Sequence, residues 1–251
     1  MNRTRVVLMT AVFALAAAAL VAATRASTAW PAHEAFALAF GAVLIPLVAS
    51  PLEWCVHRFV YHEAVIGLLR PIFVVHTAHH FVYFPTWRYV TGGPPRRLAI
   101  RRGSPVVHRT PAGNARVRLA HFSWYMAIGA VGVWAPVWAL SRDGWLLAGM
   151  VTSSAVVSNL FIVVHDTIHR PGSHRFVEAQ PWFAFLDRHH YLHHIDLGAN
   201  LNFLLPLADL AYGTLRLRPT PAEQRGHGSL ARAKAHPLGE GEPAREAARA
   251  C

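Results

Sequence analysis

Four clusters of histidines are the residues best suited to chemistry in this 251-residue chain. The chain holds 17 histidines, and ten of them fall into short boxes spaced HX4H, HX2HH, HX3H and HX2HH. Imidazole is a common protein ligand for Zn, Cu, Fe and Ni. The ten candidate metal ligands are His57, His62, His76, His79, His80, His165, His169, His190, His193 and His194.

The spacing within the boxes suits helices. Residues three and four apart share one helix face, so His76, His79 and His80 are expected to point at one spot. The boxes that begin at His165 and His190 should behave in the same way. The first box differs, because His57 and His62 are about 140° apart on an ideal helix and converge only at a helix end or a π-bulge.

The number of imidazoles predicts two metal ions, since a structural zinc site takes only four ligands. The doubled histidine in the fourth box leaves His189 as an alternative ligand to His190. Metal-bound histidines usually donate their second ring nitrogen to a carboxylate or a carbonyl. Polar neighbours that could serve in this way, with a surface acid or helix cap as the ordinary alternative, are Glu53, Asp166, Asp196, Asn200 and Asp209.

Four apolar runs must position these boxes, and each is long enough to cross a bilayer, which takes about 20 residues. They cover residues 6–24, 34–52, 120–140 and 145–164. Charged residues make up only 15% of the chain, against roughly a quarter in soluble domains. The first run could also be a signal peptide, but its length favours a retained helix.

Four crossings place both termini and the segment 53–119 on the same side of the membrane. Of the 24 lysines and arginines, all but Arg25 and Arg142 fall on that side. Short positive flanks stay in the cytoplasm, so the termini and all ten histidines are expected there. The formal charge of +11 is therefore interpreted as a topology signal and a contact for anionic lipid head groups. A nucleic-acid partner is not supported.

The remaining sequence indicates one membrane domain over residues 1–217 and a disordered basic tail over 218–251. Residues 91–118 mix Gly, Pro and Arg and are expected to form a loop. Cys55 and Cys251 form no CxxC pair, which leaves zinc ribbons, iron–sulfur sites and disulfide frameworks unsupported. The predicted fold is all-α and integral to the membrane, with about four transmembrane helices and a cytoplasmic helical cap around the di-metal site.

The ordered boxes resemble those of the fatty acid hydroxylase / sterol desaturase superfamily. Residues 53–62 resemble the first box of fatty acid 2-hydroxylases, and residues 76–85 resemble their second. Residues 207–214 resemble the D-x-x-x-G-T element that closes the family's sequences. The third box, residues 164–170, is also similar to that of carotenoid ring hydroxylases, which have a longer spacing there. The resemblance covers residues 51–214.

The resemblance implies a membrane-bound, O2-dependent hydroxylase that acts on a lipid C–H bond, first of all in a fatty acyl chain. A carotenoid ring, a sterol-like substrate and desaturation are alternatives within the superfamily. The ten histidines would hold two Fe ions, which Zn can replace in purified material. Electrons would come from a separate redox protein, because the chain has no fused haem domain.

A metal transporter or metal-sensing membrane protein is the alternative from another class. Transporters place ionisable residues near the middle of the bilayer. The four apolar runs contain almost none, which favours the oxygenase.

Overall fold

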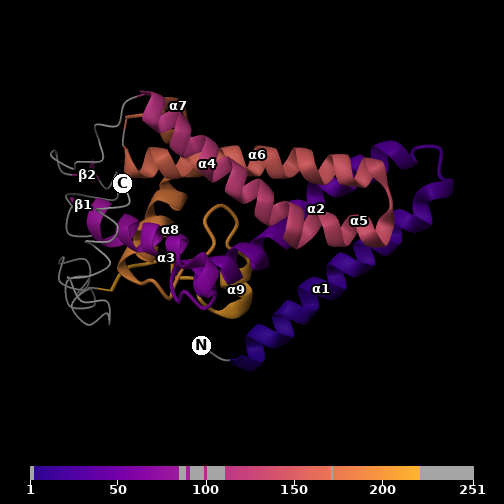
Figure 1. Cartoon of the computed structure of the whole chain (residues 1–251), viewed down its shortest axis with the longest axis horizontal. Coiled ribbons are helices and arrows are strands. Elements are labelled where there is room, and N and C mark those ends of the chain that lie inside the picture. The colour runs from indigo at the N-terminus through magenta and orange to yellow at the C-terminus, as the bar shows by residue number, and fades with distance from the viewer. Residues whose placement is uncertain (1–2, 85–88, 91–98, 101–110, 171, 221–251) are drawn as a thin grey trace. The chain divides into compact units, whose positions relative to one another are not determined.

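Apolar helices account for most of the fold. The computed structural model describes residues 3–84, 89–90, 99–100, 111–170 and 172–220 (Figure 1). Most of the predicted tail, from residue 221 on, lies outside these residues. The first helices are α1 (Arg3–Ala26), η1 (Ser27–Ala29), α2 (His33–Val56), η2 (His57–Tyr61), η3 (Gly67–Leu69), α3 (Arg70–Ala78) and η4 (His79–Tyr83). Strands β1 (Tyr89–Val90) and β2 (Ala99–Ile100) form one short antiparallel pair. The later helices are α4 (Pro111–Gly129), η7 (Ala130–Trp134), α5 (Ala135–Ser141), α6 (Gly144–His169), α7 (Arg175–Glu178), α8 (Phe183–Ile195) and α9 (Leu207–Tyr212).

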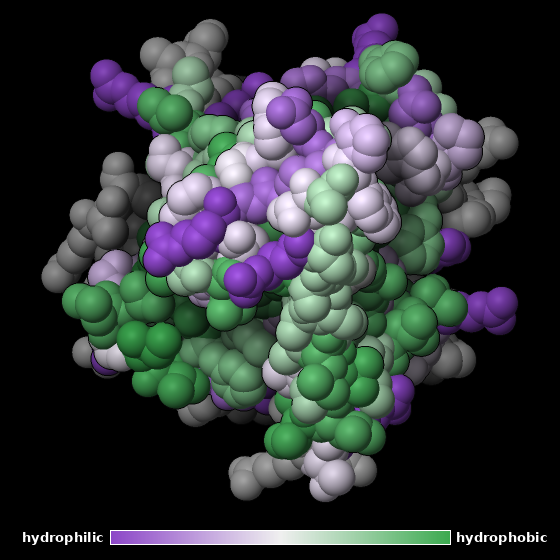
Figure 2. Space-filling model, turned by 90° about the vertical axis from the view of Figure 1, so that its right-hand side faces the viewer, coloured by the Kyte–Doolittle hydropathy of each residue, from purple (hydrophilic) through white to green (hydrophobic). Residues whose placement is uncertain are grey.

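Among the residues that the structure describes, four helical stretches are long and apolar enough to cross a membrane, which agrees with the four apolar runs predicted. They cover Thr4–Ala29, His33–Tyr61, Ala115–Ser141 and Gly144–His169. Many of their apolar side chains are exposed, including Leu15 and Val131, whose exposed fractions are 70% and 78%. Figure 2 shows a face on which hydrophobic residues cover much of the lower part and hydrophilic residues gather above them. An extended apolar surface of this kind suits contact with lipid.

The loop predicted over residues 91–118 differs from the structure in two places, because it contains strand β2 (Ala99–Ile100) and ends earlier than expected. Residues 111–118 were expected to belong to a loop, but α4 begins at Pro111. Proline is favoured in the first turn of a helix, where its missing N–H has no intrahelical partner to lose. Pro111 and Gly113, which contributed to the loop prediction, therefore lie in the first turn of α4.

The described chain forms two compact units. The first contains residues 1–53, 110–163 and 210–213, and the second contains residues 54–109, 164–209 and 214–251. The core of the first unit joins α1, α2, η7, α5 and α6 through buried apolar side chains, which are Val21, Ala37, Leu44, Ile45, Val133, Val137, Leu146 and Met150. All ten candidate ligands belong to the second unit.

Two glycines let α2 and α6 approach closely within the first unit. A Cβ atom on Gly41 would lie 2.2 Å from the carbonyl oxygen of Leu146, and one on Gly149 would lie 2.1 Å from that of Leu38. The hydroxyl of Ser153 donates to the carbonyl of Ala42 at 2.8 Å. Small residues allow backbone contact of this kind between helices in membranes.

Polar contacts join the ends of these helices. The Nε2 atom of His33 lies 2.9 Å from Asp143 Oδ2, and its Nδ1 atom lies 3.1 Å from the Ser27 hydroxyl. The other oxygen of Asp143 accepts hydrogen bonds from the first turn of α6. The guanidinium of Arg5 donates to the carbonyls of Leu210 and Ala211. These contacts fix the turn between α1 and α2 and the start of α1 within the first unit.

The glycine contacts predict a selective loss of stability. Gly149→Ala should lower the free energy of unfolding by about 1–3 kcal/mol, because the added methyl group overpacks the contact with α2. Gly144→Ala is the matched control on the same helix, since nothing lies within 4 Å of its Cβ position. Thermal unfolding of the purified protein in detergent measures both. Equal midpoints for the two variants would contradict the close approach.

Candidate metal centre

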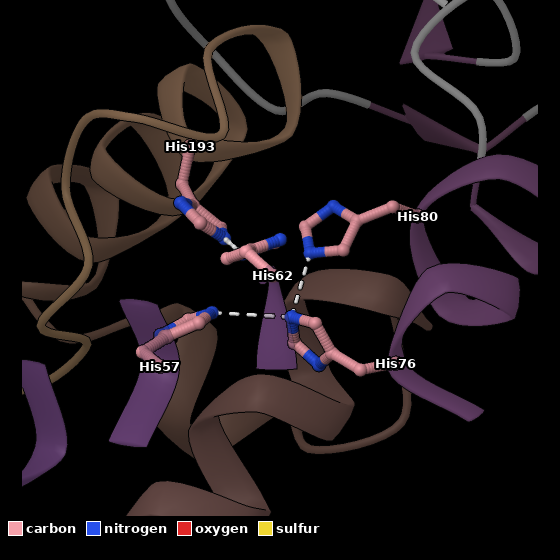
Figure 3. Close-up of side chains that lie close together, drawn as sticks. All are labelled: His57, His62, His76, His80 and His193. Carbon is pink, nitrogen blue, oxygen red and sulfur yellow. Dashed lines mark hydrogen bonds between the residues drawn. The ribbon is translucent and has the colours of Figure 1, made fainter. Parts of the chain in front are cut away.

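Nine of the ten candidate ligands form two groups in the second unit. The His57 group contains His57, His62, His76, His80 and His193. The His169 group contains His79, His169, His190 and His194. Within each group the potential ligand nitrogens all lie within 4.8 Å of one another. Either group could hold a metal ion. Figure 3 shows the rings of the His57 group turned toward one another from three segments of the chain.

A π-turn brings the two histidines of the first box together. Helix α2 passes into the π-helix η2 at His57, and the N–H of His62 donates to the carbonyl of His57 at 3.2 Å. The extra residue in this turn places the two rings in a parallel stack, with centroids 4.9 Å apart and planes 10° apart. The HX4H spacing required a helix end or a π-bulge, and the π-turn found here also ends the helix.

The HX2HH boxes divide between the two groups, so the expectation that each box points at one spot is wrong. His76 and His80 lie in the His57 group, whereas His79 lies in the His169 group. In the fourth box, His190 and His194 lie in the His169 group. The reason is rotational. Residues at i and i+4 are about 40° apart on a helix, whereas the adjacent residue turns away by about 100°.

The fourth box completes the pattern, because His193 turns away from its neighbours to join the His57 group. The two groups consequently adjoin. The ring centroids of His80 and His194, one from each group, are 4.2 Å apart.

The separations between ring nitrogens fit two ligands of one ion. The Nε2 atom of His76 lies 3.1 Å from that of His57 and 3.0 Å from that of His80. The Nε2 atom of His190 lies 2.9 Å from that of His169 and 3.1 Å from that of His194. Two nitrogens bound to one ion at about 2.1 Å are roughly 2.9–3.4 Å apart.

Hydrogen bonds among the rings do not explain this packing. A neutral ring nitrogen offers either one hydrogen or one lone pair. The Nε2 atom of His76 therefore cannot satisfy both of its close neighbours, and the same holds for His190. A cation among the rings would accept all of these lone pairs at once.

Backbone carbonyls fix the orientation of three rings. The Nδ1–H groups of His57 and His193 donate to the carbonyls of Leu201 at 2.6 Å and Ala199 at 2.8 Å. The Nδ1–H of His194 donates to the carbonyl of Phe84 at 3.2 Å. A carbonyl only accepts, so Nδ1 carries the hydrogen in each ring and Nε2 carries the lone pair. All three rings thus present a lone pair to their group.

Burial keeps these rings neutral. Burial lowers the pKa of His62, His76, His80, His190 and His194 well below 6.5, and repulsion from neighbouring imidazoles lowers each pKa further. Burial also lowers the pKa of His193 to about 4. Neutral imidazole is the form that binds metals, so the rings are ready to bind at neutral pH.

The tenth candidate, His165, lies beside the His169 group but is not a member, because membership requires ligand nitrogens that all lie within 4.8 Å of one another. Its ring stacks on His79 with centroids 4.9 Å apart. It also contacts His169 and His190, at 4.6 and 4.8 Å between centroids. A fifth imidazole therefore adjoins the second group.

His189 faces a different environment from His190. Its Nε2–H donates to the carbonyl of Asn202 at 2.7 Å, and its Nε2 atom lies 3.9 Å from Asp209 Oδ2. Burial lowers its pKa, while the bond to Asn202 acts in the opposite direction. His190, which belongs to a group, is the better ligand candidate.

The predicted polar neighbours differ in what they contact. Asp166 pairs with Arg170 and lies 3.7 Å from His174 Nε2. Asp196 Oδ2 lies 3.1 Å from Arg216 Nη1. Glu53 is half-buried in α2 and belongs to the first unit.

Asn200 and Asp209 hold the loop that carries the carbonyls. Asn200 has a φ of 53°, a conformation that asparagine tolerates. Its amide donates to the carbonyls of His189 and Arg216. Asp209 is fully buried and accepts hydrogen bonds from Leu201 and Asn202. Burial raises the pKa of its carboxyl, and these hydrogen bonds oppose the rise.

Aromatic side chains border the groups in places that sequence reasoning missed. Phe84 stacks on His169 with centroids 4.0 Å apart, and Phe203 lies 5.0 Å from His190. Tyr61 lies 4.7 Å from His76. Tyr61 lies in the π-turn η2, and Phe84 directly follows the π-turn η4. Both are aromatic residues next to a histidine box, and this position could have identified them from the sequence. Phe203 had no such signal.

Comparison with family models, with curated proteins and with solved structures finds no match to this chain.

The two groups predict a metal content of two ions per chain. His76→Ala and His190→Ala should each lose at least one ion, since each removes a central nitrogen of one group. His189→Gln should keep both, because its amide can still donate to the carbonyl of Asn202. Elemental analysis of purified protein measures the content. A loss in His189→Gln together with full content in His190→Ala would reverse the assignment.

Burial of neutral rings also predicts acid sensitivity of the metal-free protein. The pKa of His193 is about 4 in the folded protein and 6.5 in the unfolded chain. Between these values the unfolded chain binds more protons, so stability is full above pH 6.5 and is lost as the pH falls toward 4. Each pKa unit is worth about 1.4 kcal/mol.

The expected result is a Tm in detergent that falls between pH 7.5 and 5, and falls less in His193→Gln. A Tm that stays constant across this range would show that the rings are not buried in neutral form.

Proposed function

We propose that this protein is a membrane-bound, O2-dependent di-iron hydroxylase that acts on a lipid C–H bond. The observation that carries the proposal is the pair of adjoining imidazole groups. Two of their members, His57 and His169, lie at the ends of two membrane-length helical stretches. A structural site would need neither ten nitrogens nor two adjacent ions. Redox chemistry at the membrane uses both.

The residues fit iron. Imidazole is among the ligands that suit Fe, and five rings are available to each ion when His165 is counted with its neighbours. The ligand nitrogens of each group converge, and backbone carbonyls hold the second nitrogens of His57, His193 and His194. Zinc fits the same donors, so purified protein is expected to carry either metal.

Two iron ions supply what the side chains lack, which is the binding and reductive activation of O2. Hydroxylation places one oxygen atom in the C–H bond, releases the other as water, and consumes two electrons and two protons. The resemblance to the hydroxylase superfamily assigns the electrons to a separate redox protein. Desaturation by the same site is the alternative outcome.

The border of the His169 group favours an apolar substrate. Phe84 and Phe203 are both buried and lie against His169 and His190 of this group. Their rings exclude water from one side of the site. A hydrocarbon chain enters such surroundings at little cost in desolvation free energy, whereas a polar substrate would lose its hydrogen bonds to water.

The resemblance of the first two boxes to fatty acid 2-hydroxylases places a fatty acyl lipid first. A carotenoid ring and a sterol-like lipid follow. From the distribution of lysine and arginine we infer that the site and both termini lie on the cytoplasmic side, with anionic head groups nearby.

Lipid analysis tests this proposal. Expression under oxygen should produce a hydroxylated lipid that is absent without the gene, and His79→Ala should abolish it because that ring belongs to the His169 group. His174→Ala is the control, since that histidine lies outside both groups and near Asp166. Metal uptake with an unchanged lipid profile would instead support a transporter or metal sensor.

A further inference from the structure

Two rings of the His57 group are held by one short loop. The carbonyl of Leu201 accepts from His57 Nδ1 at 2.6 Å, and the carbonyl of Ala199 accepts from His193 Nδ1 at 2.8 Å. These two rings come from α2–η2 and from α8, which are far apart in sequence. The loop therefore sets the relative position of two nitrogens in the same group.

The peptide groups that supply these carbonyls are themselves bonded through their N–H groups. In the peptide between Leu201 and Asn202, the N–H donates to Asp209 Oδ2 at 2.7 Å. In the peptide between Ala199 and Asn200, the N–H donates to the carbonyl of Thr214 at 3.0 Å. Each peptide thus links a ring on one side to the D-x-x-x-G-T segment on the other.

Asp209 is arranged to accept and not to donate. Its Oδ1 receives the N–H of Leu201 at 2.9 Å and the hydroxyl of Thr214 at 2.6 Å, while its Oδ2 receives the N–H of Asn202. The Thr214 oxygen accepts the indole N–H of Trp54 at 3.0 Å. Trp54 precedes His57 by three residues on α2. With donors on both oxygens, the carboxylate is bound as an anion.

The Asp209 carboxylate polarises His57 through the peptide group between Leu201 and Asn202. Hydrogen bonds in a chain polarise one another, and a buried site with a low dielectric strengthens the effect. The charge on Asp209 draws the N–H of Asn202 and makes the Leu201 carbonyl a stronger acceptor. That carbonyl draws the Nδ1–H of His57, which raises the electron density on Nε2. The arrangement is a carboxylate–histidine pair with a peptide group inserted.

We propose that Asp209 is a positioning residue for the His57 group, which orients His57 and strengthens its Nε2 as a metal donor through the Leu201–Asn202 peptide. The inference rests on the proposed function only in that the His57 group must bind a metal, and it holds whichever lipid is the substrate.

Zinc affinity tests this role in the full-length protein in detergent, titrated against a chelator of known affinity. Asp209→Asn keeps the size of the side chain and removes its charge. We expect the affinity for one of the two zinc ions to fall about 10–100-fold, the usual cost of losing an outer-shell partner. The other ion, in the His169 group, should be bound as in the wild type. His57→Ala identifies which ion is which.

Two further variants separate tuning from stability. Thr214→Val removes one hydrogen bond to Oδ1 and the acceptor of the Trp54 indole N–H, but keeps the charge of Asp209 and its contact to Asn202. It should lower the Tm of the metal-free protein and leave zinc affinity near the wild-type value. Glu178→Gln is the control, because this carboxylate lies on α7 and accepts the N–H of Gly172, outside the loop that Asp209 holds. It should change neither site.

The reduction potential of the iron-loaded protein gives a readout that a purely structural role would not move. A more electron-rich His57 favours ferric iron, so Asp209→Asn should raise the potential of one ion, and Thr214→Val should not.

Wild-type affinity for both zinc ions in Asp209→Asn would overturn the inference. So would a zinc affinity in Thr214→Val that falls in step with Tm, and this variant alone decides the question if Asp209→Asn does not fold. Absence of tight zinc binding in the wild type would instead overturn the metal centre itself.

Discussion

Each neutral imidazole has one lone pair, and the second unit packs several of these lone pairs about 3 Å apart in a buried space. Such packing is unfavourable without a cation, since the rings can neither all be protonated nor all pair with one another. The surrounding structure meets this constraint by holding the far nitrogens on backbone carbonyls. A site that costs stability in the absence of metal is a reason to regard metal as part of the folded protein.

Helix geometry distributes the rings between the two groups. The i, i+4 pairs of the HX2HH boxes, His76 with His80 and His190 with His194, each stay within one group. The remaining member of each box turns into the neighbouring group, so two short helices each serve both sites. The π-turn at His57 has a different effect. It stacks His57 on His62, five residues later, although an α-helix would hold these two rings apart. Local changes in helical pitch therefore shape the site.

The sequence was sufficient for the four membrane-length helices, because apolar length is a direct signal. The ten histidines could also be selected as a set that lies together. The division of the boxes was missed, since a shared helix face was taken to mean a shared metal. The carbonyls of Ala199 and Leu201 could not be foreseen, because a backbone atom leaves no mark in residue type. The one sequence signal near these carbonyls was Asp209, in the D-x-x-x-G-T element. The structure shows that this residue holds the loop that carries them.

The two groups differ in what surrounds them, and the difference bears on how a lipid would approach. The His57 group is fastened by polar contacts from the loop that Asp209 organises. The His169 group is bordered by the phenyl rings of Phe84 and Phe203. Desolvation favours an apolar chain at the second border. If a lipid is the substrate, as proposed, its entry beside the His169 group costs the least desolvation free energy. His57, whose Nε2 is strengthened by Asp209, then lies in the neighbouring group.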